Sequence, residues 1–98
     1  MFAVIGEWRM SPELDDDQHT GLQRIVAGVS QLPGLVAGYW TGAADGATSH
    51  TFIIFAEAAA AHAFASDVKG NIENQRRAGV ENVSLVIEEV TAHTSEPR

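Results

Sequence analysis

The stretch HTFIIFAEAAAAHAF, residues 50–64, changes from bulky β-branched and aromatic residues to alanines within two positions. Bulky side chains of this kind are typical of strands, whereas alanine is the strongest helix former. The stretch therefore predicts a strand over residues 48–56 that passes directly into a helix beginning at Glu57. The apolar stripe expected on that single helix consists of Ala61, Phe64, Ala65, Val68 and Ile72, and the helix is expected to end at the polar segment before Gly79.

The rest of the chain divides into a first helix and three further strands. Ser11-Pro12 is a helix start signal, and Pro33-Gly34 is a stop signal. Between them, apolar residues recur at spacings of three and four, which predicts an amphipathic helix. Asp45-Gly46 is typical of a hairpin turn. The remaining strands are predicted over residues 2–10, 35–41 and 82–90.

The resulting order of elements is βαββαβ. With right-handed crossovers, this order gives a four-stranded antiparallel sheet with both helices on one face, the ferredoxin-like α+β arrangement. We expect one domain over residues 1–92 and a polar tail over residues 93–98.

The strands are apolar on both of their faces, which is unusual for a sheet with helices on one side only. Phe2 and Val4 alternate with Ala3 and Ile5, and the FIIF segment of residues 52–55 repeats the pattern. An uncovered face of this composition exceeds the apolar patch that a monomer usually exposes. We therefore expect a second copy to cover the open face, sheet against sheet about a two-fold axis.

Composition restricts the partners and the compartment. Thirteen acidic and six basic residues give a net charge of −7, which disfavours nucleic acid and anionic membrane surfaces as partners. The chain has no cysteine and its first residues do not read as a signal peptide, so we expect a cytoplasmic protein. A metal site is not expected, because no two histidines have the spacing of a metal-binding pair.

Two segments carry a resemblance to a known superfamily: QLPGLVAGYW, residues 31–40, and FIIFAEAAAAHAFASDV, residues 52–68. In both, the order of strand, helix and turn residues resembles that of the dimeric α+β barrel proteins, specifically the small antibiotic-biosynthesis-monooxygenase type. The resemblance implies a homodimer. It also implies cofactor-independent oxidation of an aromatic phenol or quinol by oxygen. The haem-degrading relatives are excluded, because the position of their axial histidine, six residues beyond Asp67-Val68, is Glu73 here.

Such an oxidation requires an aromatic-lined, dry pocket and a group that favours the phenolate. We expect the pocket to lie between sheet and helices, without cofactor or metal. The substrate-binding residues predicted for it are Trp8, Tyr39, Trp40, Phe55 and Phe64.

His50 is the predicted catalytic acid or base, since it enters a strand and shares a face with Phe52 and Ile54. His62 lies off the apolar stripe of its helix and is expected at the surface. The alternative to an enzyme is a non-catalytic homodimer that binds a small apolar or aromatic metabolite. The two interpretations share the fold and the dimer and differ in the chemistry of the pocket.

Overall fold

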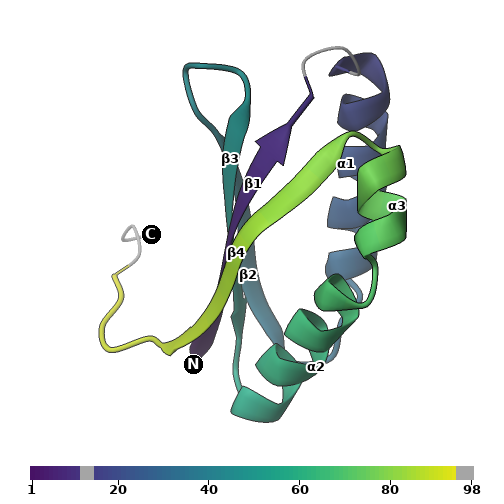
Figure 1. Ribbon diagram of the computed structural model, residues 1–98. Helices are drawn as coiled ribbons and strands as arrows, with labels where there is room; N and C mark the ends of the chain where they lie inside the picture. The colour runs from purple at the N-terminus through teal and green to yellow at the C-terminus, as the bar shows by residue number, and fades with distance from the viewer. Residues whose placement is uncertain (12–14, 95–98) are drawn as a thin grey trace.

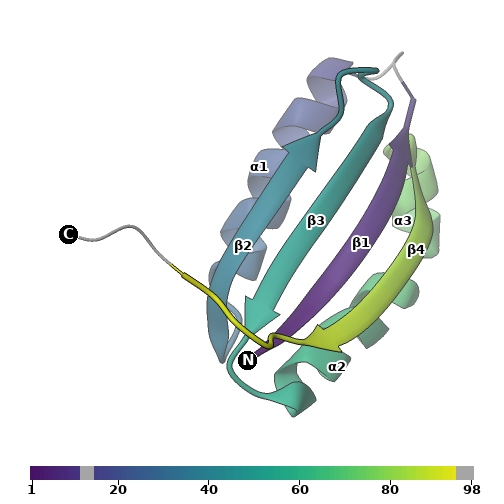
Figure 2. The same cartoon turned by 90° about the vertical axis from the view of Figure 1, so that its left-hand side faces the viewer.

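The computed structural model describes residues 1–11 and 15–94 of the chain. The strands are β1 (Phe2–Met10), β2 (Leu35–Gly42), β3 (Thr48–Phe55) and β4 (Val80–Glu89), and the helices are α1 (Asp15–Val29), α2 (Ala58–Lys69) and α3 (Ile72–Arg77). The four strands form one antiparallel sheet in the order β2-β3-β1-β4. All three helices cover one face of this sheet and leave the other open (Figures 1 and 2). The predicted ferredoxin-like α+β fold is confirmed.

The predicted turn signals lie where the structure turns. Gly34, which follows α1, has φ 78°, and Gly46, in the hairpin between β2 and β3, has φ 71°; both values favour glycine. In the same hairpin the Asp45 carboxylate accepts bonds from the N–H groups of Ala47 and Thr48 and from the Thr48 hydroxyl. These hydrogen bonds, that from Ala47 first, lower the pKa of Asp45. The turn is thus fixed by local hydrogen bonds.

The second helix is divided in two, whereas a single helix was predicted from Glu57 to the segment before Gly79. It breaks at Gly70 and Asn71, where the Asn71 backbone (φ −110°, ψ 24°) leaves the helical region. Both residue types are weak helix formers. The Gln75 side-chain amide donates to the Val68 carbonyl at 2.8 Å, which satisfies a backbone acceptor at the end of α2. As a result Ile72 is 48% exposed and does not belong to the buried stripe.

The core lies between the sheet and α2. It consists of Val4, Ile53, Phe55, Val29, Ala61 and Ala65, all of them buried. The two core alanines allow α2 to lie close to the sheet, and the Phe64 ring packs against Phe55 with centroids 5.5 Å apart. Between α1 and the sheet the layers are less closely filled, since Ile25 of α1 is 54% exposed.

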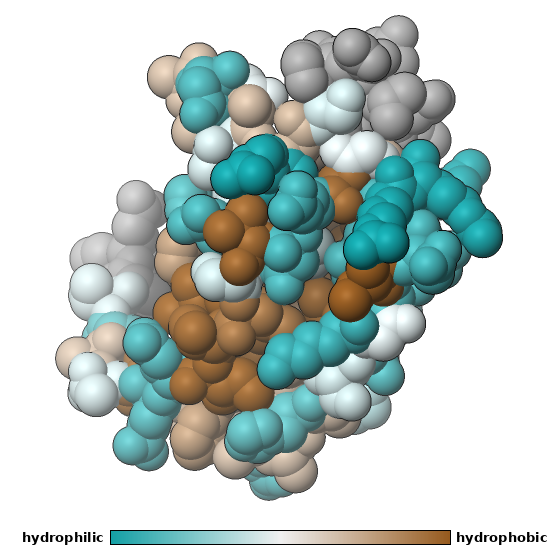
Figure 3. All heavy atoms as spheres, in the orientation of Figure 1, coloured by the Kyte–Doolittle hydropathy of each residue, from teal (hydrophilic) through white to brown (hydrophobic). Residues whose placement is uncertain are grey.

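The open face of the sheet is apolar, as expected. Strand register places Ile5 opposite Phe52 and Val86, and Phe52 opposite Tyr39. Tyr39 and Val86 are 58% and 47% exposed. Figure 3, viewed from the β4 edge, shows apolar side chains gathered over the lower half of the sheet with polar ones around them. Within the described ranges, no helix has the length and apolar character needed to span a membrane.

Candidate functional site

A cavity of about 520 Å³, here called the inner cavity, lies between the sheet and the helices. Trp8 of β1, Trp40 of β2 and Phe64 of α2 supply its aromatic wall, and Leu22 and Ile25 of α1 line the opposite side. This position explains the exposure of Ile25, which faces the cavity instead of the core. The volume lies in the range of small-molecule sites in proteins.

Each tryptophan of the inner cavity is placed by a glycine two residues earlier in its strand. A Cβ at Gly6 would lie 2.6 Å from Nε1 of Trp8, and a Cβ at Gly38 would lie 2.9 Å from the ring of Trp40. Both indoles therefore fold back over a position that has no side chain. The Trp8 indole N–H also donates to the Thr51 hydroxyl at 3.1 Å, which fixes the orientation of its ring. The repeated Gly-x-Trp pattern was visible in the sequence, but its role was not predicted.

The end of the inner cavity near the break between α2 and α3 is polar. Asn71, Asn74 and Gln75 line it, and the Asn74 side-chain amide donates to the Asn71 side-chain oxygen at 2.6 Å. Asp67 of α2 and Arg24 of α1 add one carboxylate and one guanidinium. An aromatic wall facing amides and a carboxylate is suited to a flat ligand with a polar group at one edge. Sequence reasoning missed these residues, because it treated this segment as the polar end of one continuous helix.

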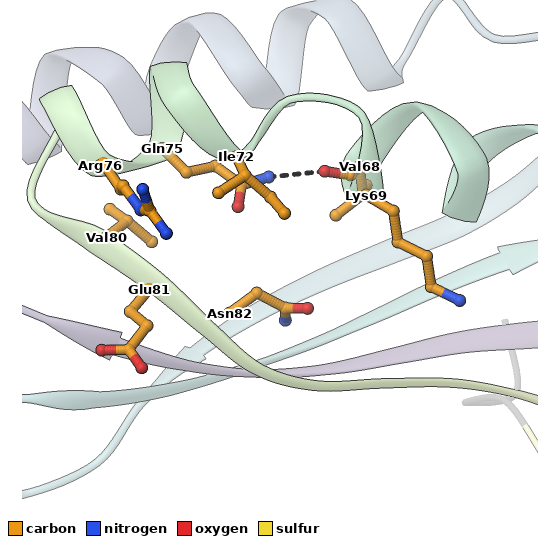
Figure 4. Close-up of a pocket in the computed structure, with 8 residues that line it drawn as sticks. All are labelled: Val68, Lys69, Ile72, Gln75, Arg76, Val80, Glu81 and Asn82. Atoms are coloured by element: carbon orange, nitrogen blue, oxygen red, sulfur yellow. Dashed lines mark hydrogen bonds between the residues drawn. The ribbon is translucent and has the colours of Figure 1, made fainter.

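A second hollow, here called the outer groove, lies between α3 and the start of β4 and has a volume of about 480 Å³ (Figure 4). Its polar lining comes from Lys69, Arg76, Glu81 and Asn82, and Ile72 adds apolar surface. Three residues line both hollows: Val68, Gln75 and Val80. The inner cavity and the outer groove are therefore neighbours that share a wall.

Of the five predicted substrate-binding residues, three line the inner cavity: Trp8, Trp40 and Phe64. Phe55 lies in the core, 1% exposed, where it supports Phe64. Tyr39 does not line the cavity. Because successive side chains of a strand point to opposite faces, placing Trp40 on the helix side puts Tyr39 on the open face.

His50 also lies outside the inner cavity. It pairs with Glu7 of β1 in the sheet register and shares the open face with Phe52, as predicted, but that face is on the opposite side of the sheet. Its Nε2 lies 3.6 Å from Oε1 of Glu7, and both side chains are more than 40% exposed. The expectation that His50 is an acid or base of the pocket between sheet and helices is thus not met by its position.

The predicted absence of a metal site stays a prediction. In residues 1–11 and 15–94, no three histidine or acidic side chains form a group that could hold a metal ion. His62 is exposed on α2, in the position expected for it.

The fold resembles those of known structures. A candidate antibiotic biosynthesis monooxygenase from Deinococcus radiodurans matches with a TM-score of 0.79 and 14% identity over 100% of both chains. A Streptomyces coelicolor monooxygenase solved in complex with nanaomycin D matches with a TM-score of 0.61 and 11% identity, over 98% of this chain and 92% of that one. A dimeric ferredoxin-like protein of unknown function from Jannaschia matches with a TM-score of 0.51 and 14% identity, over 90% of this chain and 99% of that one.

No family model matches the chain, and no curated protein matches it either. At these identities the structural matches define the fold alone. The chain shares its ferredoxin-like fold with proteins of the antibiotic-biosynthesis-monooxygenase type, and the predicted resemblance is confirmed at the level of the fold.

Proposed function

We propose that the chain binds an aromatic phenol or quinol in the inner cavity and oxidises it with molecular oxygen, without a cofactor. The observation that carries this proposal is the inner cavity itself, in which Trp8, Trp40 and Phe64 face a polar end. Stacking on such a wall orients a flat ring. The structural likeness to monooxygenases supports the same reading.

The chain's own contribution to the reaction is a proton acceptor and an aromatic wall that orients the ring. Asp67 is the one carboxylate among the described residues that line the inner cavity, and it accepts the phenolic proton. The resulting phenolate passes one electron to oxygen, and the two radicals combine at a ring carbon. Loss of water from the peroxide then leaves a quinone, so one phenol and one oxygen molecule give one quinone and one water. Arg24, which also lines the cavity, favours the phenolate by its charge.

Oxygen uptake with polyhydroxylated naphthalenes and anthracenes, in the absence of any added cofactor, tests this proposal. Replacing Asp67 by asparagine should lower the rate by about 100-fold or more, because general-base catalysis typically contributes that much. Glu73→Gln is the matched control, since Glu73 is an exposed acid of α3 that lines neither hollow. Equal rates for the two variants would remove Asp67 from the mechanism, and no uptake with any compound would exclude the oxidation.

A non-catalytic binding protein is the second candidate, and one observation favours it. The polar side chains at the end of the inner cavity already have partners within the protein: Asn74 donates to Asn71, and Gln75 donates to the Val68 carbonyl. Side-chain amides of this kind can hydrogen-bond to a ligand after they reorganise, but they do not act as general acids or bases. Quenching of Trp8 and Trp40 by an aromatic ligand, without oxygen uptake, is the result that this candidate predicts.

We also propose that the active form is a homodimer joined through the open faces of two sheets. Tyr39, Phe52 and Val86 form an exposed apolar surface there, and burying such surface stabilises an interface by about 25 cal/mol per Å². The segment that follows β4, residues 90–94, leaves the sheet on its open side (Figures 1 and 2). It thereby extends toward the space that a partner would occupy. In this dimer the His50–Glu7 pair lies at the interface between sheets.

Sedimentation equilibrium at micromolar concentration tests the dimer, and Phe52→Glu should convert it to a monomer. Phe52 lies on the open face, so the new carboxylate would have to be buried without a partner. Val26→Glu is the matched control, because Val26 is similarly exposed (38% against 36%) but belongs to α1, on the other side of the molecule. A monomeric wild type would contradict the proposal, and so would equal dissociation of the two variants.

A further inference from the structure

The wall shared by the inner cavity and the outer groove contains one polar side chain among the described residues. Of its three residues, Val68 ends the packed part of α2 and Val80 begins β4, while Gln75 spans the distance between them from α3. Gln75 is held by a single hydrogen bond, from its amide to the Val68 carbonyl at 2.8 Å (Figure 4). A glutamine side chain with one such bond can rotate aside at modest cost. Rotation of the Gln75 side chain would therefore open a passage between the two hollows.

The charge around the two hollows differs from that of the whole molecule. Within residues 1–11 and 15–94, Arg24, Lys69 and Arg76 contribute three basic side chains to the two linings, and Asp67 and Glu81 contribute two acidic ones. The chain as a whole has six basic residues against thirteen acidic ones. Basic residues are thus concentrated around the two hollows, where they attract an anion that the rest of the surface repels.

Two of these cations lie free in the outer groove. In the part of the chain that the structure describes, neither Lys69 nor Arg76 has an ion pair, and Figure 4 shows them toward opposite ends of the groove. The acidic side chain in the lining of the groove, Glu81, lies 4.0 Å from Arg9 of β1. The groove therefore offers two unpaired cations next to apolar surface from Ile72.

We propose that the ligand of the inner cavity is an aromatic compound with a flexible carboxylate tail. The aromatic part lies against Trp8 and Trp40, the tail passes Gln75, and the carboxylate lies in the outer groove, attracted by Lys69 at one end and Arg76 at the other. This inference rests on the proposed function only in that the inner cavity must bind the aromatic part. It adds the substrate class and assigns Lys69 and Arg76 as specificity-determining residues.

A pair of probes that differ only in the charge of the tail tests this inference. The first is hexanoic acid carrying a para-nitrophenyl group at its far end, and the second is the matching alcohol. Nitroaromatic rings quench tryptophan, and the chain's two tryptophans both line the inner cavity, so quenching reports binding there. The wild type should bind the acid more tightly than the alcohol, and added salt should reduce this preference.

Arg76→Gln and Lys69→Gln should each reduce the preference for the acid by roughly two- to fivefold, the usual effect of an exposed ion pair, and leave alcohol binding unchanged. Arg77→Gln is the matched control, because Arg77 is the next residue of α3, is exposed and lines neither hollow. The inference is overturned if the preference is absent in the wild type, or if Arg77→Gln reduces it as much as Arg76→Gln does. Binding of both probes without preference would remove the tail site and keep the proposed cavity, whereas quenching by neither probe would exclude both.

Discussion

Replacing Gly6 by alanine should destabilise the protein and disturb the inner cavity. The added Cβ would lie 2.6 Å from Nε1 of Trp8 and 2.8 Å from the hydroxyl oxygen of Thr51, whereas ordinary contacts begin at 3.4 Å. The indole and the hydroxyl must therefore each move away from residue 6 by much of an ångström. Their hydrogen bond, now 3.1 Å, would be lost.

The size of the effect follows from three contributions. Overpacking at a close contact costs about 1–3 kcal/mol. Loss of the hydrogen bond adds about 0.5–1.5 kcal/mol. Replacing glycine by alanine in a strand returns about 0.5–1 kcal/mol. We expect the free energy of unfolding to fall by about 2 kcal/mol, which lowers the melting temperature by roughly 8–16 °C in a domain of this size.

Urea unfolding at a fixed protein concentration, followed by tryptophan fluorescence, measures this change; the concentration is fixed because a dimer's stability depends on it. Gly42→Ala is the matched control, since Gly42 also lies in a strand but a Cβ there would meet nothing within 4 Å. That variant should be as stable as the wild type or slightly more stable. If Gly6→Ala unfolds at the same urea concentration as Gly42→Ala, the Trp8 indole does not pack over residue 6, and the description of the cavity wall is wrong.

Four further changes have expected outcomes. Gly38→Ala should displace the Trp40 ring, whose nearest atoms would lie 2.9 and 3.0 Å from the new Cβ, and weaken quenching by aromatic ligands in a fluorescence titration. Phe55→Ala should lower the free energy of unfolding by about 3–5 kcal/mol in urea, because it empties a fully buried site; a loss below about 1 kcal/mol would contradict the core. Gly28→Ala should raise the free energy of unfolding by up to about 1 kcal/mol in the same assay, because this glycine is exposed in a helix and has free space around it. The pKa of Asp45 is lowered on folding. Its contribution to the free energy of unfolding is therefore complete above its ordinary pKa of 3.8 and is lost as the pH falls through the pKa of the folded state. The urea midpoint of Asp45→Asn should therefore lie below that of the wild type at about pH 7 and approach it near pH 3.

Local signals in the sequence were sufficient for most of the fold. The strand-to-helix change at residues 55–58, the Pro33-Gly34 stop and the Asp45-Gly46 turn each depend on neighbouring residues only, and the structure has all three. The sequence did not predict the break between α2 and α3 at Gly70. The apolar spacing of this segment continues to Ile72, whereas the backbone dihedral angles of Asn71 and the bond from Gln75 to the Val68 carbonyl show that the helix ends there.

The sequence by itself determined the element order and the apolar character of both sheet faces, because hydrophobic periodicity and turn residues are local properties of the chain. Which face each aromatic residue occupies was decided only in the tertiary structure. Alternation along a strand relates Tyr39 to Trp40 but does not say which of them meets the helices. The packing of α1 and α2 made that choice: it directed both tryptophans into the inner cavity and left Tyr39 and His50 on the open side. Three aromatic residues of the cavity wall, Trp8, Trp40 and Phe64, were predicted from the sequence. The polar end of the cavity could not be, because it is formed by helices that only the folded chain brings together.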